Sequence, residues 1–414
     1  MHNTHMGYMK NTIAGFSWQT VLKLLTMVII LVKTFFLARI LTPSDFGLFA
    51  LIAIALGIAE ATTETGVNLT IIQSKRTIKY FIDTAWVIAI IRGFIIGIVM
   101  VLMGIGMSEF FNEPSLRVLI ATAALVPVVK GFINPSIVLF HKNLDFFKDS
   151  LFRFVVILFD ASIAVIIALT IKSVLALILA LIISGLFEVF LSFIIFKDKP
   201  TFNYIPSRAK IIFSNAKGLS ISAALSYINE NIDDFLLGKI IGTYSLGLYH
   251  NAYSLGHKVN YDFAKSANHS ILPVFTKIVT EADRLKNAFI KSIVVTSIIT
   301  VGFSIPLIIA PKFIVSLILG EQWLSITPHL YLFVIAGIIQ SISIIFYALF
   351  YAKKKYSTVN FHLLITVIML TTLLLLLPKQ YGLQGAGIAI VLSRLITLPY
   401  LFFKAFLLFK GKTK

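Results

Sequence analysis

The sequence has no cysteine and few charged residues. Only 13% of its 414 residues are charged and only 18 are Asp or Glu, whereas a soluble domain carries about 25% charged residues. The absence of cysteine excludes disulfides and thiolate chemistry. No segment reads G-x-x-x-x-G-K-[ST], which excludes a P-loop nucleotide site and therefore an ATP-driven motor within this chain.

Apolar residues dominate what is present. They make up 58% of the chain, and the mean hydropathy is +0.93. A helix that spans a bilayer needs about 20 mostly apolar residues. We therefore predict an all-α integral membrane protein with about 12 transmembrane helices, which excludes a large soluble domain and most ordinary enzyme folds. The apolar windows are 12–38, 46–72, 81–107, 116–140, 150–170, 174–196, 212–238, 245–272, 288–310, 326–351, 358–377 and 383–403.

The distribution of cations predicts the orientation. The chain has 36 Lys and Arg residues and a net charge of +18. If both termini are cytoplasmic, 21 of these cations lie in cytoplasmic segments and 6 in outside loops, as the positive-inside rule requires. This explains the positive charge, so we expect no nucleic-acid partner. Lys10 precedes a long apolar run without an A-x-A cleavage site, which predicts a retained first helix rather than a signal peptide.

The two halves of the sequence resemble each other. Three pairs of segments recur in the same order at offsets of 200, 208 and 210: residues 39–49 and 239–249, 110–113 and 318–321, 139–140 and 349–350. Each set of six helices has the same orientation, because six is even. We predict two six-helix lobes, 1–197 and 211–414, related by a parallel pseudo-two-fold axis and joined by a cytoplasmic linker at 198–210.

Polar residues within the apolar windows mark a candidate site. A charge at the bilayer centre costs about 2.5–3.5 kcal/mol on insertion scales, so such charges should face water, one another or a ligand. Stripes of polar residues at helical spacing occur on windows 12–38 and 46–72 and on their repeat equivalents, 212–238 and 245–272. We predict that these four helices line one polar cavity shared between the lobes. The candidate residues are Lys23, Glu60, Glu64, Asn229, Glu230, Asp233, Lys258, Asp262 and Lys265.

Structural roles explain some of the intramembrane charges equally well. The stem of a lysine is long enough to bring its ammonium group to the interface, and acids can pair with cations of neighbouring helices. Lys258 and Asp262, four residues apart, could form such a pair on one helix face. Charges outside the four polar stripes or at their ends include Lys33, Arg92, Lys130, Asp160, Glu188, Lys291 and Arg394.

Three motifs carry a resemblance to a known family. Residues 37–50 (LARILTPSDFGLFA), 232–242 (IDDFLLGKIIG) and 319–323 (LGEQW) resemble motifs of the polysaccharide transporters. These belong to the multidrug/oligosaccharidyl-lipid/polysaccharide exporter superfamily, and the motifs favour its Wzx-like, O-antigen flippase branch. The resemblance covers essentially the whole chain. It implies a MATE-like fold and alternating access in a bacterial or archaeal plasma membrane.

The resemblance also implies a function and its partners. The chain would flip a polyprenyl-diphosphate-linked oligosaccharide from the cytoplasmic to the outer leaflet for O-antigen, capsule or exopolysaccharide assembly. Lys23, Lys258 and Lys265 are the candidates for binding the diphosphate, while the acids and Asn229 are candidates for contacts with the sugars. The partners implied are the lipid-linked oligosaccharide, membrane lipids and other polysaccharide-assembly proteins.

The energy source is predicted less directly. Without a nucleotide site, uphill transport must draw on a proton or sodium gradient, on the membrane potential or on downstream polymerisation. Asp233 has no cation three or four residues away on its own helix, so Asp233 and the nearby Glu230 are the candidates for ion coupling. We expect no other cofactor, no metal and no catalytic residue.

Two other classes of protein fit parts of the pattern. An ion-coupled multidrug exporter of the same fold would use an acidic cavity for cationic drugs, and Glu60, Glu64, Glu230 and Asp233 are compatible with it. A membrane glycosyltransferase or polymerase is disfavoured, because such enzymes need a large outside loop or an interfacial D-x-D-like site. Here the outside loops are short, and Asp233-Asp234 lies within a predicted helix.

Overall fold

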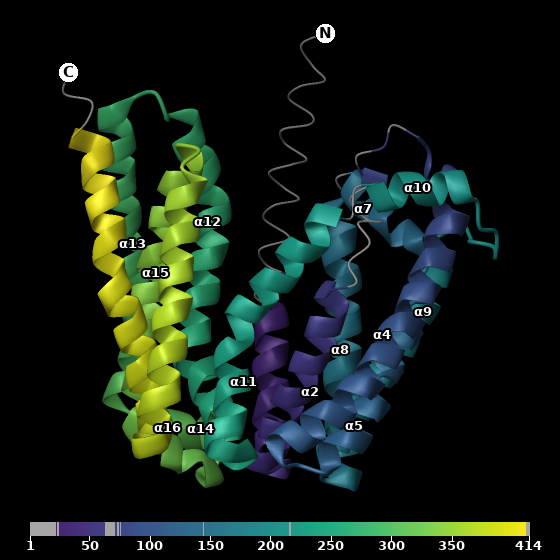
Figure 1. Ribbon diagram of the computed structural model, residues 1–414, viewed down its shortest axis with the longest axis horizontal. Helices are drawn as coiled ribbons and strands as arrows, with labels where there is room; N and C mark the ends of the chain where they lie inside the picture. The colour runs from purple at the N-terminus through teal and green to yellow at the C-terminus, as the bar shows by residue number, and fades with distance from the viewer. Residues whose placement is uncertain are drawn as a thin grey trace. The chain divides into compact units, whose positions relative to one another are not determined.

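The computed structural model describes residues 22, 25–62, 71–72, 74, 76–143, 145–214 and 217–410. The side chains of 62, 214, 217–226, 228, 229 and 269 are outside this description. All regular structure in the described residues is helical (Figure 1). Contacts divide the chain into an N-terminal unit, Met1–Asn231, and a C-terminal unit, Ile232–Lys414. The predicted division at a 198–210 linker stays a prediction.

The spanning helices are long and apolar, as predicted. Within the described residues, 7 helices are long and apolar enough to cross a membrane, and a bent pair, Ser115–Lys130 with Pro135–Lys142, would make 8. The window 116–140, which we expected to be one span, is therefore bent by 71°, next to Pro135. The exact count of twelve stays a prediction, because α16 alone contains two of the predicted windows.

The N-terminal unit begins with a helical segment at residues 25–40. Its Lys33 forms an ion pair with Asp160, with Nζ 2.6 Å from Oδ2, so both charges are neutralised inside the unit. The following elements are α2 (Pro43–Thr62), η1 (Ile78–Tyr80), α4 (Ile82–Phe111), α5 (Ser115–Ala123), α6 (Leu125–Lys130), η2 (Pro135–Val138), α7 (Leu139–Lys142), α8 (Phe146–Ile171), α9 (Leu175–Ile195), α10 (Pro206–Ser214) and the first part of α11 (Lys217–Tyr253).

The C-terminal unit is built around α15. In the span Glu321–Ala352, which contains α15, 78% of the most apolar window is buried, against 17% for α13. Helices α12, α13 and α16 pack against α15 (Figure 1). The elements after α11 are η3 (Ser254–Lys258, a π-helix), α12 (Val259–Lys277), α13 (Ala282–Ile309), α14 (Pro311–Ile318), η4 (Glu321–His329), α15 (Leu330–Ala352) and α16 (Tyr356–Lys410).

The first motif of the sequence forms a helix cap. Thr42 and Asp45 make reciprocal contacts at the start of α2: the Thr42 amide donates to Asp45 Oδ2 at 2.9 Å, and the Asp45 amide donates to Thr42 Oγ1 at 3.3 Å. This is a capping box, which satisfies amides that the helix leaves unpaired. Asp45 Oδ1 also accepts from the Val174 amide at 3.0 Å, so the cap ties α2 to the start of α9.

The internal repeat is visible in the backbone. The chain breaks at residues 41–42, between the helical segment 25–40 and α2, and α11 breaks at Gly242, 200 positions later, where φ is 76°. Asn112 and Gly320, 208 positions apart, both have positive φ, 56° and 104°. Asn112 is in the left-handed helical region, with ψ of 38°, which asparagine tolerates. Gly320 has ψ of 170°, in a region open essentially to glycine alone, so the two positions share a positive φ but not one conformation.

The third predicted pair shows the same correspondence in its hydrogen bonds. The Asp145 amide donates to the Phe140 carbonyl at 2.8 Å, and the Lys355 amide donates to the Phe350 carbonyl at 2.8 Å. These two bonds are 210 positions apart, which is the offset found in the sequence. The first and third predicted pairs thus share a local backbone feature, the second shares a positive φ, and the repeat of whole lobes stays a prediction.

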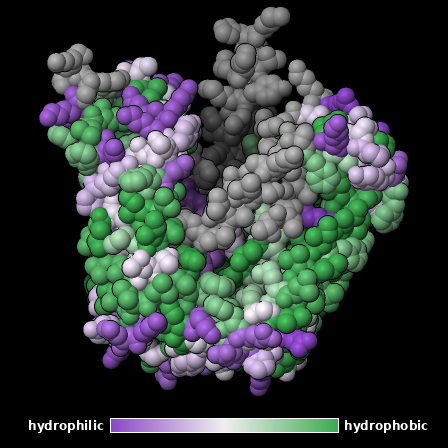
Figure 2. All heavy atoms as spheres, in the orientation of Figure 1, coloured by the Kyte–Doolittle hydropathy of each residue, from purple (hydrophilic) through white to green (hydrophobic). Residues whose placement is uncertain are grey.

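Large apolar side chains cover the outer faces of the spanning helices. Hydrophobic residues spread over the flanks of both units in Figure 2. On α13, Ile298 and Ile309 are 66% and 76% exposed. In water such surfaces would be unstable, whereas in a bilayer they face acyl chains.

Candidate functional site

The N-terminal unit has an open charged pocket of about 650 Å³ between its helices. Six helices (α2, α4, α6, α8, α9 and α11) or the segments next to them form its wall. Each of these helices contributes one charged side chain, so that three acids and three bases face the same space. In chain order they are Glu60, Arg92, Lys130, Arg153, Glu188 and Glu230.

Glycines allow the helices around the pocket to approach closely. A Cβ atom on Gly93 of α4 would lie 2.5 Å from the Pro127 carbonyl oxygen of α6, so no larger residue fits there without movement of the backbone. A Cβ on Gly57 of α2 would lie 2.0 Å from Cζ of Tyr227. Because Gly57 has no side chain, the Tyr227 ring rests against α2 and its hydroxyl donates to the Ala53 carbonyl at 2.9 Å.

Polar contacts hold several of the pocket's charges in position. The Arg92 guanidinium donates through Nη2 to the Glu60 carbonyl at 2.8 Å, which fixes α4 against α2. Arg153 pairs with Asp149 one turn earlier on α8, at 3.0 Å. Glu188 interacts electrostatically with Lys130 and Arg153. The pocket is therefore lined by charges whose positions the helices fix in advance.

This arrangement can bind a ligand that carries both an anion and hydroxyl groups. Guanidinium and ammonium groups form charge-assisted hydrogen bonds with phosphate oxygens. Carboxylates accept hydrogen bonds from hydroxyl groups. The volume lies within the range of small-molecule sites, about 300–1,000 Å³.

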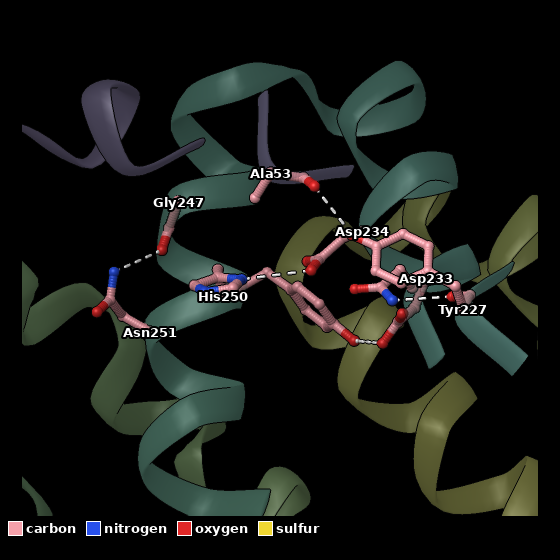
Figure 3. Close-up of polar contacts among 9 residues, drawn as sticks. Ala53, Tyr227, Asp233, Asp234, Gly247, His250 and Asn251 are labelled. Atoms are coloured by element: carbon pink, nitrogen blue, oxygen red, sulfur yellow. Dashed lines mark hydrogen bonds and ion pairs between the residues drawn. The ribbon is translucent and has the colours of Figure 1, made fainter. Parts of the chain in front are cut away.

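The C-terminal unit has a second polar cluster, on α11. Asp233 is only 6% exposed, and its Oδ2 accepts a hydrogen bond from the Tyr249 hydroxyl at 2.5 Å. Asp234 Oδ2 lies 3.3 Å from His250 Nδ1. Figure 3 shows the contact between Asp234 and His250. Both contacts span the break at Gly242 and so connect the two parts of α11.

An aromatic ladder continues from this cluster along the chain. The rings of Tyr249 and Tyr253 stack at 5.7 Å, those of Tyr253 and His257 at 4.3 Å, and those of His257 and Tyr261 at 5.7 Å. The four residues are spaced by four, so their rings follow one face of the helix through the π-helical turn. The Lys265 ammonium lies 5.4 Å from the Tyr261 ring centroid and extends the ladder by one position.

The predicted site residues fall into four groups. Glu60 and Glu230 line the charged pocket, and Asp233 is buried in the α11 cluster. Lys258 and Lys265 are exposed and Asp262 is half-buried, all in or next to α12. Lys23, Glu64 and the Asn229 side chain lie outside the described residues. The shared cavity between the lobes, and these residues as its lining, stay a prediction.

Sequence periodicity missed most of the pocket's charges. Arg92, Lys130 and Glu188 looked like scattered single charges, and Arg153 lies close to the start of its apolar window. Each comes from a different helix, so no stripe on any one helix could reveal them. One feature of the sequence could have revealed the pocket. The chain has few charged residues, yet four of them lie in four consecutive predicted spans.

Apolar helices with a charged pocket among them define this chain as a multi-pass membrane protein. The sequence model of a family described as polysaccharide biosynthesis protein matches residues 36–328, and the chain belongs to this family. It is similar to the lipopolysaccharide biosynthesis protein WzxC of Escherichia coli K12, with 23% identity over 354 residues, 84% of this chain and 72% of that protein. The predicted relationship to the Wzx-like transporters is thus confirmed.

Solved structures show the same fold. The lipid II flippase MurJ, in an inward closed conformation, superposes with a TM-score of 0.69 at 14% identity, covering 94% of this chain and 87% of MurJ. An inward-facing multidrug resistance MATE transporter of the MOP superfamily superposes with a TM-score of 0.68 at 14% identity, covering 94% and 96%. The predicted MATE-like fold is therefore confirmed.

Proposed function

We propose that this protein flips a polyprenyl-diphosphate-linked oligosaccharide across the membrane for cell-surface polysaccharide assembly, by alternating access. The observation that carries the proposal is the pocket in which three cations and three carboxylates face one space of about 650 Å³. Family membership supports it, since the relative WzxC is named for lipopolysaccharide biosynthesis and the structural neighbour MurJ is named a lipid II flippase.

The physical argument rests on the cost of intramembrane charge. Each charged side chain at the bilayer centre costs about 2.5–3.5 kcal/mol on insertion scales. Several charges gathered in one pocket are costly unless a polar ligand uses them, and the cost is smaller for Arg153, which pairs with Asp149 near the start of α8. Arg92, Lys130 and Arg153 suit an anionic group of the substrate, and Glu60, Glu188 and Glu230 suit the hydroxyls of its glycan. The lipid tail can remain in the bilayer.

The finer parts of the proposal concern topology and partners. The protein would lie in a bacterial or archaeal plasma membrane with both termini in the cytoplasm, as the cation asymmetry favours. It would act as a transporter and not as an enzyme, with membrane lipids and other polysaccharide-assembly proteins as partners. Lys23, Lys258 and Lys265 remain the candidates for first contact with the diphosphate, and Glu64, Asn229 and Asp262 for further contacts with the glycan.

Ion coupling is proposed at Asp233, with Glu230 as the second candidate. Asp233 is buried, and the contact with the Tyr249 hydroxyl spans the break in α11. A carboxylate at such a break could bind a proton or sodium ion in one state and release it in another, and a charge crossing 100 mV gains about 2.3 kcal/mol. The expected result is that gradient-stimulated flipping in vesicles is lost in Asp233→Asn. Stimulation equal to wild type would remove Asp233 from the coupling role.

The main experiment is reconstitution with lipid-linked oligosaccharides of defined headgroup. Flipping is measured in proteoliposomes for the wild type and for Arg92→Gln and Glu188→Gln, which remove one cation and one acid from the pocket. Arg117→Gln is the matched control, because Arg117 is exposed on α5 and lies outside the pocket. We expect both pocket variants to lose most of the flipping activity and the control to retain it.

The same vesicles separate the competing functions. Transport of a lipophilic cation without flipping of the lipid-linked glycan would replace the proposal by a multidrug exporter. Wild-type flipping in both pocket variants, at equal protein in the membrane, would show that the pocket does not bind the substrate.

A further inference from the structure

The segment between α9 and α11 is held at the ends of two membrane spans. α9 ends at Ile195 and α4 begins at Ile82. Asp83 Oδ1 accepts a hydrogen bond from the Thr201 amide at 2.7 Å, and Thr84 Oγ1 accepts one from the Ile205 amide at 3.2 Å. These bonds fix residues 201–205, and α10 after them, beside the first turn of α4. A chain that crosses the bilayer through α4 and α9 leaves the hydrocarbon region at this level.

Helix α10 is amphipathic, with one apolar face buried and a second one open. Ala209 and Ile212 are buried in the cluster that includes residues of α4. Ile211 and Phe213 are exposed, and Phe202 in the preceding segment is 74% exposed. Figure 2 shows hydrophilic and hydrophobic residues side by side at this end of the N-terminal unit. Exposed apolar residues at the end of a span match the boundary between headgroups and acyl chains.

Two arginines converge on one ring beside α10. The Arg76 guanidinium lies 4.1 Å and the Arg208 guanidinium 4.4 Å from the centroid of Tyr80. In the described part of the chain no carboxylate pairs with either guanidinium. Asp198 pairs instead with Lys79, with Oδ1 3.3 Å from Nζ. Two like charges around one ring repel each other, and an anion between them relieves that repulsion.

Other groups nearby add to the positive charge. The Lys142 ammonium donates to the Arg76 carbonyl at 2.6 Å, which anchors the segment that carries Arg76. Lys199 and Lys210 are exposed on the segment around α10. The acid Asp83 is occupied by the Thr201 amide and hydroxyl. The surface therefore combines cations with apolar side chains at one level of the bilayer.

We propose that this surface binds the headgroup of an anionic phospholipid. Arg76 and Arg208 hold the phosphate oxygens, while Ile211 and Phe213 lie against the upper acyl chain. A free phosphate would contact the arginines only and leave the apolar side chains in water. A phospholipid contacts the arginines through its phosphate and the apolar side chains through its acyl chains. The site differs from the charged pocket, and it depends only on the chain spanning a membrane.

The first test uses the wild-type protein and needs no variant. Purified full-length protein is mixed with phosphatidylglycerol or phosphatidylcholine of identical acyl chains, and the lipid retained is counted by native mass spectrometry. We expect preferential retention of phosphatidylglycerol, weakened by salt. Equal retention of the two lipids would overturn the proposal. Displacement of phosphatidylglycerol by an equal concentration of inorganic phosphate would also overturn it, in favour of a free phosphate site.

The second test localises the site. In the double variant Arg76→Gln/Arg208→Gln we expect the apparent affinity for phosphatidylglycerol to fall roughly thirtyfold, from about 1 kcal/mol per cation near an anionic surface. Arg39→Gln is the matched control: its guanidinium lies 3.7 Å from the Phe35 ring centroid, just before α2, without a second arginine. An equal loss in Arg39→Gln, or no loss in the double variant, would contradict the assignment.

Discussion

The close approach of α4 and α6 beside the pocket can be tested by replacing single glycines of α4 with alanine and comparing the stability of the variants. Gly93 and Gly106 both lie in α4, so replacing either by alanine gains the same helix propensity, about 0.5–1 kcal/mol. A Cβ on Gly93 would meet the Pro127 carbonyl oxygen at 2.5 Å, whereas a Cβ on Gly106 has nothing within 4 Å. The propensity gain cancels between the two variants. What remains is the cost of overpacking, about 1–3 kcal/mol.

The expected order of stability is Gly106→Ala, then Gly97→Ala, then Gly93→Ala. Gly97 is intermediate because its Cβ would meet Cγ2 of Val128 at 3.0 Å and the Ala124 carbonyl oxygen at 3.2 Å, both longer than the 2.5 Å contact at Gly93. The assay is thermal unfolding of purified protein in nanodiscs, followed by fluorescence at one fixed scan rate because unfolding of such proteins is commonly irreversible.

The refuting result is equal stability of Gly93→Ala and Gly106→Ala. It would mean that α4 and α6 lie further apart than described and that the pocket is wider. The flipping assay adds a second readout: Gly93→Ala should lower flipping because Gly93 lines the pocket, and Gly106→Ala should not.

Two further predictions concern buried polar contacts. Tyr249→Phe leaves Asp233 without its hydroxyl donor and should lower stability by about 1–3 kcal/mol; the thermal assay measures it, and a gain in stability would contradict the 2.5 Å hydrogen bond. For the Lys33–Asp160 pair, each single variant, Lys33→Met or Asp160→Asn, should be less stable than the double variant, because a single change leaves one charge unpaired in the membrane. A double variant less stable than both singles would show that the charges do not neutralise each other.

Local periodicity and repeated segments in the sequence were enough to predict the spanning helices and some of the backbone bends. Long apolar windows gave the spanning helices, and the repeated segments marked where the backbone bends, as at Asn112 and Gly320. A further pair of positive-φ residues was not noticed in the sequence. Lys172 and Gly382, 210 positions apart, have φ of 48° and 53°, but ψ is 41° at Lys172 and −130° at Gly382. The two residues share the sign of φ and not a conformation, and because their types differ, sequence comparison does not detect the pair.

The pocket could not be predicted from any one helix. Periodicity placed Glu60 on a polar face of α2, yet its neighbours Arg92, Lys130 and Glu188 come from three other helices. Their proximity depends on how closely the helices pack, and this is set by glycines such as Gly93. Packing of this kind is a tertiary property that a hydropathy pattern does not contain.

The predicted repeat allows the helix face beside the charged pocket to be compared with its counterpart in the second half of the chain. Ala53 and Gly57 of α2 are small, and Gly57 and the next residue on that face, Ala61, border the pocket. At the 200-residue offset of the repeat, Ala53 corresponds to Tyr253 and Gly57 to His257, whose stacked rings belong to the aromatic ladder. Small side chains leave room between helices, whereas stacked rings fill it. If the predicted repeat holds, the helix face that leaves space beside the charged pocket in the first half is covered by stacked aromatic rings at the corresponding positions of the second half.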